Sequence, residues 1–185
     1  MRVLVHIDDV LGFHYGVDLE IMMRHIKEGD EVHATVCNGG LNVCPANHYH
    51  EERVCCRCRS KRRRGFEAGN LNKVKKHKIE LEKYKGKIGI PKVNSIQELK
   101  GIRWEAASTV ITALREPNPD IEKNSNIVER SLFTAEAMYR EAKKYIERIK
   151  LDRCYVFNGR RASQMPLVRA CWEKGVEIYT YEGGH

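Results

Sequence analysis

The sequence lacks several features that would assign a class at once. No run approaches the about 18 apolar residues that a membrane-spanning helix needs, and Met1–Phe13 has no small-residue cleavage site, so it is not expected to be a signal peptide. The P-loop, the G-x-S-x-G elbow and the H-E-x-x-H motif are absent. The seven cysteines are an odd number, which argues against a fully paired secreted disulfide framework. We therefore expect a cytoplasmic protein.

Positive charge is unevenly distributed along the 185 residues. Residues 53–78 contain eleven Lys and Arg against one acidic residue, Glu67, so this segment is more positive than the whole chain, whose net charge is +8. Three interpretations stay open: a solvated helix face, a surface for anionic lipid at the inner membrane or for a pyrophosphate-linked substrate, and a nucleic-acid site. Only Tyr49 and Phe66 lie near the Arg57–Arg64 run, so stacking platforms are few and nucleic acid is not expected.

Strands and helices alternate at both ends of the chain. The apolar run Arg2–Ile7, the amphipathic stretch Val17–Lys27 and the run Glu31–Cys37 predict a parallel βαβ unit. An apolar stripe with spacings of 3 and 4 predicts a long helix over Ile121–Lys150. Further elements are expected at Lys78–Tyr84 (edge strand), Ser95–Lys100 and Arg103–Arg115 (helices), Arg153–Phe157 (strand), Pro166–Lys174 (helix) and Val176–Tyr181 (strand). The pattern predicts an α/β fold: one Rossmann-like domain, 1–185, with a doubly wound, mostly parallel sheet and a Cys-rich, basic insertion over 38–70 that could bind metal.

Polar residues follow the predicted strands at their carboxyl ends. The strand Arg153–Phe157 stops at Asn158-Gly159, a pair that tolerates positive φ, and Arg160 follows it. In an open α/β sheet such a junction is where ligands bind. Asn158, Gly159, Arg160 and Glu182 are therefore candidate substrate-binding residues, and Asp8, Asp9 and His14 are candidate acid–base groups. The alternative is an ordinary connection with surface arginines, turn carboxylates and a surface histidine.

Five cysteines lie within 22 residues, and a chelating pair is among them. Cys55-x-x-Cys58 has the spacing of half a tetrahedral zinc site, because a tight turn would bring both thiolates onto one ion, and Cys37 and Cys44 could supply the other half. A helix is expected to start only in the basic tail that follows, Arg59–Asn70. Either His48 or His50 could replace a cysteine, and an iron–sulfur cluster would also accept four thiolates. Such a zinc ion would be structural, because four protein ligands leave no open position. Free thiols or disulfides formed during handling are the alternative.

Several of these residues together resemble a known family. Residues 16–32 read GxDLEIMxxHxxxGDEV; Cys37-Asn38-Gly39, the spaced cysteines, Phe157-Asn158-Gly159-Arg160 and a terminal Tyr-Glu-Gly-Gly follow. This resembles the N-terminal half of bacterial capsule or surface-polysaccharide glycosyltransferases of the GT-B type. The resemblance implies an acceptor-binding domain for a carbohydrate or lipid-linked acceptor. The nucleotide-sugar would bind in a C-terminal half that the chain, ending at His185, lacks.

Two functions compete on this basis. As an acceptor domain, the chain would use Asp8, Asp9 or His14 to deprotonate an acceptor hydroxyl, and Arg160 with the Asn158-Gly159 turn to hold substrate or phosphate. As a zinc-stabilised binding module, it would recognise nucleic acid or another polyanion through Arg57–Arg64.

Overall fold

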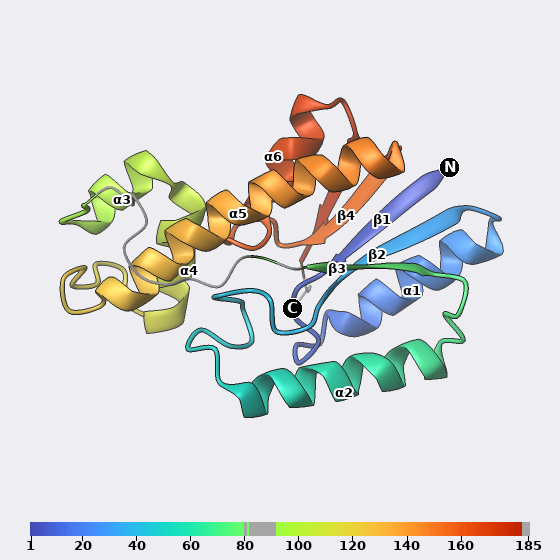
Figure 1. Cartoon of the computed structure of the whole chain (residues 1–185), viewed down its shortest axis with the longest axis horizontal. Helices are drawn as coiled ribbons and strands as arrows, with labels where there is room; N and C mark the ends of the chain where they lie inside the picture. Colours follow the sequence, from blue (N-terminus) through green and yellow to red (C-terminus); the bar gives the residue numbers. More distant parts are fainter. Residues whose placement is uncertain (80, 82–91, 183–185) are drawn as a thin grey trace.

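The computed structural model of the chain describes residues 1–79, 81 and 92–182 (Figure 1). Its centre is one five-stranded sheet with the order β3-β2-β1-β4-β5. All four strand pairings are parallel. The strands are β1 (Arg2–Ile7), β2 (Glu31–Cys37), β3 (Lys75–Ile79), β4 (Arg153–Phe157) and β5 (Glu177–Tyr181).

The central strand β1 explains why the sheet is covered on both faces. Every residue of β1 after Arg2 is buried, and successive side chains of a strand point to opposite faces. Leu4 packs in the core formed with the C-terminal helices, whereas Val5 and Ile7 pack in the core formed with the N-terminal ones. A continuous apolar run is thus what a parallel strand between two helical layers requires.

The helices form two layers and one lateral group (Figure 1). One face is covered by α1 (Tyr15–Lys27) and α2 (Glu52–Ala68), and the other by α5 (Ser125–Ile149) and α6 (Met165–Glu173). The short helices α3 (Ile96–Ile102) and α4 (Trp104–Leu114) pack against the first half of α5. The predicted α/β class with a Rossmann-like doubly wound sheet is confirmed.

The 25-residue helix α5 contributes to three separate groups of buried side chains. Near its N-terminus Val128 and Leu132 pack with α3 and α4. In its middle, Phe133 and Met138 meet the side chains of Cys37, Leu41 and Ile79. Its C-terminal part packs with α6, β1 and β4. The predicted stripe is therefore present, but α5 buries a wider surface than one stripe because it also carries this middle group.

Element boundaries depart from the prediction in the basic half of the chain. We expected a helix to start near Arg59 after a polar loop, with a tight turn at Cys55–Cys58. The structure begins α2 at Glu52, so this turn prediction is wrong: Cys55 and Cys58 lie three residues apart on one helix face. The predicted edge strand Lys78–Tyr84 is displaced to β3, and residues 80 and 82–84 of that prediction lie outside the described residues.

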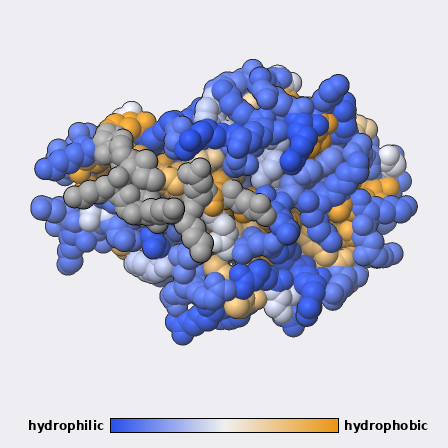
Figure 2. Space-filling model, in the orientation of Figure 1, coloured by the Kyte–Doolittle hydropathy of each residue, from blue (hydrophilic) through white to orange (hydrophobic). Residues whose placement is uncertain are grey.

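The surface in Figure 2 is mostly hydrophilic, with scattered apolar side chains. In the described parts of the chain, none of the helices combines the length and the apolar character needed to cross a membrane.

Gly65 lets α2 approach α1. A Cβ built on Gly65 would lie 2.5 Å from the hydroxyl oxygen of the buried Tyr15 ring, which donates a hydrogen bond to the Arg62 carbonyl. Gly65→Ala is therefore expected to lower the free energy of unfolding by about 1–3 kcal/mol, as overpacking does. In α1, Gly16 has open space around its Cβ position, and Gly16→Ala is the matched control that should not destabilise. Urea denaturation measures both; equal stabilities would contradict this account of the α1–α2 contact.

Candidate functional site

The candidate site lies where the winding of the sheet changes direction, between β1 and β4. The chain runs outward from β1 to β2 and β3 on one side, and from β4 to β5 on the other. The loops after β1 and β4 diverge there, and ligands of such sheets bind in the crevice that this divergence leaves. The residues that follow the two strands, Asp8-Asp9 and Asn158–Gln164, therefore face the position where a ligand is expected.

A buried hydrogen-bond network ties these two loops together. Ser163 Oγ donates to Asp8 Oδ2, and Gln164 Nε2 donates to Asp8 Oδ1 at 3.4 Å. His6 Nε2 lies 2.9 Å from the Ser163 carbonyl oxygen, and its Nδ1 lies 2.7 Å from Thr35 Oγ1. Because a carbonyl only accepts, Nε2 carries the proton and Nδ1 accepts from the threonine hydroxyl. Burial lowers the pKa of His6, which keeps the ring in this neutral form.

Asp9 and His14 shape the loop after β1. Asp9 Oδ1 accepts from the Leu11 amide at 2.7 Å, which leaves Oδ2 as the oxygen that this turn does not use. His14 Nε2 donates to the Asp9 carbonyl at 3.1 Å, and its ring stacks on Phe157 with centroids 3.8 Å apart. Far from being a surface histidine, His14 is 5% exposed. Gly12 permits this position, because a Cβ there would lie 2.5 Å from the ring.

Asp18 is a third carboxyl group at this edge, and sequence reasoning missed it. It lies in α1, is 1% exposed, and accepts a hydrogen bond from the Tyr181 hydroxyl. Burial raises the pKa of Asp18 well above its ordinary value; the Tyr181 hydrogen bond opposes this shift, and the charges of Asp8 and Asp9 add to it. The sequence signal was its place on the otherwise apolar side of the predicted helix.

Three of the predicted substrate-binding residues lie on the loop after β4, and the fourth, Glu182, follows β5. Asn158 and Gly159 have positive φ values of 62° and 75°, and a Cβ on Gly159 would lie 3.0 Å from a Thr180 methyl carbon. Arg160 Nε donates to Asn158 Oδ1 at 2.7 Å, and Arg160 Nη2 lies 3.3 Å from Glu182 Oε1. The four residues are neighbours at the same sheet edge as Asp8; their roles in binding stay predictions.

The four cysteines predicted to bind metal line one small pocket of about 20 Å³ together with Asp8. Backbone and amide N–H groups point at the sulfurs: the Gly39 amide donates to Cys37 Sγ and Asn47 Nδ2 to Cys55 Sγ, both at 3.3 Å. Burial is the largest cause that raises the pKa of the Cys44, Cys55 and Cys58 thiols, and the charge of Cys37 adds to each shift. The four cysteines that line the pocket are Cys37, Cys44, Cys55 and Cys58.

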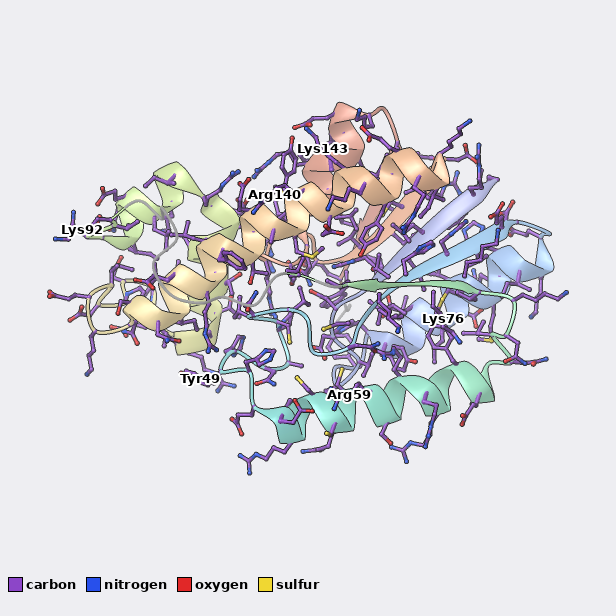
Figure 3. The ribbon with its side chains drawn as sticks, in the orientation of Figure 1. Tyr49, Arg59, Lys76, Lys92, Arg140 and Lys143 are labelled. Atoms are coloured by element: carbon purple, nitrogen blue, oxygen red, sulfur yellow. The ribbon has the colours of Figure 1, made fainter. Side chains whose placement is uncertain are left out.

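Part of the basic run holds α2 against these loops. Arg62 donates to the Cys37 carbonyl and, at 2.6 Å, to Asn38 Oδ1; Arg59 donates to the Asn38 carbonyl at 3.3 Å. Lys61 Nζ reaches the Leu11 carbonyl at 3.3 Å. Figure 3 shows Arg59 on the side of α2 that faces the sheet. The outward side of α2 carries the exposed side chains of Arg53, Arg57, Arg63 and Arg64.

His48 faces the same edge from the loop between β2 and α2. Its Nε2 atom is buried and has no hydrogen-bond partner among the described residues. Burial lowers the pKa of His48; the nearby positive charge of Arg161 lowers it further, whereas the negative charge of Asp9 raises it. The sequence had offered His48 only as a spare metal ligand, because nothing local indicates that its loop returns to the end of β1.

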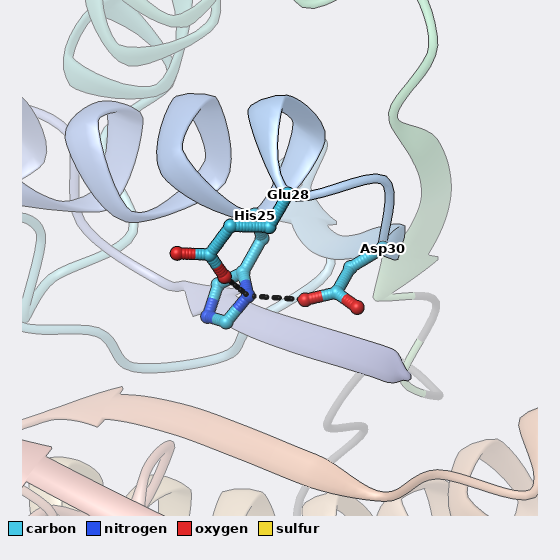
Figure 4. Close-up of side chains that lie close together, drawn as sticks. All are labelled: His25, Glu28 and Asp30. Atoms are coloured by element: carbon cyan, nitrogen blue, oxygen red, sulfur yellow. Dashed lines mark hydrogen bonds and ion pairs between the residues drawn. The ribbon is translucent and has the colours of Figure 1, made fainter.

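A second group of possible metal ligands lies at the opposite, amino-terminal edge of the sheet. His25, Glu28 and Asp30 have ligand atoms within 4.8 Å of one another, the one such group of three or more in the described part of the chain (Figure 4). The donor set is compatible with zinc. However, Asp30 already pairs with His25 Nδ1 at 2.7 Å and with the Met1 amine at 2.6 Å.

Comparison with known proteins gives structural neighbours only. No protein-family profile matches the chain, and neither does any curated protein sequence. A deacetylase of the teicoplanin biosynthesis pathway matches with a TM-score of 0.53 and 16% identity over 98% of this chain and 67% of that one. The zinc-inhibited form of teicoplanin deacetylase Orf2 (13% identity, covering 98% and 67%) and pantothenate synthetase from Thermus thermophilus (15%, covering 100% and 56%) both have TM-scores of 0.49, too low to support an argument.

These findings correct the functional interpretation drawn from the sequence. The reported neighbour whose TM-score supports an argument is a deacetylase, not a GT-B glycosyltransferase. The resemblance to a capsule or surface-polysaccharide glycosyltransferase, and the sugar-transfer function derived from it, are therefore wrong. The motifs behind the resemblance include two Asn-Gly turns, Cys37-Asn38-Gly39 and Phe157-Asn158-Gly159-Arg160, and such turns after a strand occur in many α/β folds. At 16% identity, the deacetylase match itself shows a common fold alone.

The raised pKa of Asp18 leads to a prediction of how stability depends on pH. Because its folded-state pKa is raised, Asp18 contributes stability that is complete below its unfolded pKa, near 3.8, and is lost as pH rises through the folded value. Asp18→Asn removes this loss, so the stability of the variant relative to wild type should rise with pH above about 4, by about 1.4 kcal/mol per unit of pKa shift. Thermal unfolding at a series of pH values measures it, and a difference independent of pH would contradict the assignment.

Proposed function

We propose that the chain is a hydrolase of the deacetylase kind, with its catalytic groups at the carboxyl edge of the sheet between β1 and β4. The observation that carries the proposal is the Asp8-Asp9 pair, buried at the end of the central strand, with one Asp9 oxygen left unused by the surrounding turn. The fold shared with a deacetylase of teicoplanin biosynthesis supports it.

The geometry suggests different roles for the two carboxylates. Both oxygens of Asp8 accept hydrogen bonds from the loop after β4, so Asp8 orients that loop. Asp9 Oδ2 is the better candidate for a general base that takes a proton from water as the water attacks an acyl carbonyl carbon. The C–N bond then breaks, and the proton passes to the departing amine. His48, whose lowered pKa favours a neutral ring with one N–H, could donate to the carbonyl oxygen.

Asp9→Asn tests the base. Asn keeps the oxygen that accepts from the Leu11 amide but removes the basic carboxylate, so kcat for acetate release from N-acetylated amino sugars and small acetamides should fall by about 10²–10⁴-fold. Asp120→Asn is the matched control: Asp120 Oδ1 likewise accepts from a backbone amide, that of Lys123 at 3.0 Å, but Asp120 is exposed and far along the chain from the site.

The proposal fails if wild-type protein releases acetate from none of these substrates. It also fails if Asp9→Asn retains full activity. An equal loss in the Asp120 variant would indicate general damage, and thermal unfolding of both variants checks this directly.

A separate proposal concerns metal: we propose that Cys37, Cys44, Cys55 and Cys58 hold a structural zinc ion. Their common pocket and the amide donors at Cys37 and Cys55 support it, since thiolate ligands are stabilised by such hydrogen bonds. No three of these sulfurs lie within 4.8 Å of one another, so they would have to move closer to bind at about 2.3 Å. Zinc there would join the loop after β2 to α2. The catalytic proposal involves no step on this ion.

Cysteine substitution distinguishes a four-sulfur site from unspecific thiols. Freshly purified wild-type protein should contain one zinc per chain, and Cys55→Ser/Cys58→Ser should lose it and melt at a lower temperature. Cys56→Ser is the control, because Cys56 is exposed on the same helix and does not line the pocket. Detection of iron and acid-labile sulfide in place of zinc would assign an iron–sulfur cluster to these cysteines. Metal-free protein that takes up no zinc, or equal loss in the Cys56 variant, would refute it.

A further inference from the structure

A second, larger cavity lies beside the candidate site. It has a volume of about 390 Å³ and is enclosed by α3 and α4 on one side and the loop after β4 on the other. Ligand pockets typically measure about 300–1,000 Å³, so a small organic molecule fits. Its walls combine three cations, one large aromatic ring and several neutral polar groups. From the sequence, only the Asn158–Arg160 side of this cavity had been predicted to bind substrate.

The cations come from two different parts of the chain. Lys100 projects from α3, whereas Arg160 and Arg161 follow β4. Glu182 is an acidic neighbour of Arg160, but both side chains are more than half exposed, so this 3.3 Å pair is weakened by solvent. The cavity therefore has a surplus of positive charge and guanidinium groups whose planar forks match the oxygens of a phosphate. The positive charge of Arg161 also lowers the pKa of His48, so it acts on the same edge of the sheet as Asp9.

The opposite wall offers a surface for a ring. Trp104, the first residue of α4, lines the cavity and is 45% exposed, an unusual position for so large an apolar side chain. One and two turns further along the helix, Ser108 and Thr112 add hydroxyl groups that can bond to polar substituents.

The wall is held rigidly against the β4 loop. In α4, Thr109 Oγ1 accepts from the Ala162 amide at 2.8 Å, directly beside Arg161. The buried Glu105 pairs with Arg169 of α6 at 2.9 Å. These bonds hold α4 against the β4 loop and α6, so the two walls of the cavity are joined by contacts of the fold itself.

We propose that this cavity binds a phosphate ester that carries a ring, with the phosphate on Arg160, Arg161 and Lys100 and the ring against Trp104. The inference extends the proposed function, because the phosphate would belong to the substrate whose acyl group reaches Asp9. Only this connection to Asp9 rests on the proposed function; the binding of a phosphate ester in the cavity does not. A sugar and a nucleoside both present a ring beside a phosphate, and the experiment separates these two sources.

The two tryptophans of the chain allow a direct binding measurement. Trp172 is exposed on α6 and does not line the cavity, so Trp172→Phe leaves Trp104 as the only tryptophan. Titration of this variant with glucose 6-phosphate and with uridine monophosphate should give a saturable fluorescence change for at least one of them. The corresponding neutral compound, glucose or uridine, should bind at least about tenfold more weakly, because it lacks the charge-assisted bonds. In Trp104→Phe, the remaining Trp172 should report no change.

Charge variants in the Trp172→Phe background test the assigned cations. Arg160→Gln and Lys100→Gln should each weaken binding by about tenfold, whereas Arg64→Gln on the outer side of α2 should leave it unchanged. The proposal is overturned if no phosphate ester changes the Trp104 signal, if neutral and phosphorylated compounds bind equally, or if the Arg64 variant weakens binding as much as the Arg160 variant. Thermal unfolding checks that every variant is folded.

Binding and turnover separate this proposal from the proposed function. Ligand binding without any acyl hydrolysis would contradict the hydrolase but support the cavity. Hydrolysis that continues while no phosphate ester binds would contradict the cavity alone.

Discussion

The contact between Ser163 and the end of β1 is the interaction on which the candidate site depends. Through its hydroxyl, Ser163 bonds to Asp8, and through its carbonyl it accepts from His6. These two bonds join the loops that leave β1 and β4 in opposite directions. Buried polar networks are costly when incompletely satisfied and rigid when complete. Here a single residue of the second loop fixes the conformation of the first.

That network also explains how three carboxyl groups can share one buried edge. Asp8 is satisfied by two donors, Asp9 is turned toward the backbone amides of its own loop, and burial beside Tyr181 raises the pKa of Asp18. Carboxyl groups with such different surroundings can serve different purposes: one as a structural anchor, one as a base, and one as a buried hydrogen-bonding group.

The sequence allowed the sheet to be predicted because its signals are local. The apolar run of β1, the positive-φ pair Asn158-Gly159 and the periodicity of α5 each depend on neighbouring residues. What could not be predicted depends on contacts distant in the sequence. His48 approaches Asp9, and α4 faces the β4 loop, only because the long crossovers return to the same edge. The helical placement of Cys55 and Cys58 was also missed, since a Cys-rich, Arg-rich stretch has almost no apolar periodicity to indicate a helix.

The length of α5 has a consequence for the cooperativity of folding. Its 25 residues extend about 37 Å, and the same rod joins the α3–α4 wall to the sheet core. A local opening that released α3 and α4 would also uncover the first turns of α5, and fraying of its last turns would disturb the packing of β4. Amide protons along α5 should therefore exchange with solvent mainly through global opening, so that the α3–α4 wall and the strand layer unfold as one unit.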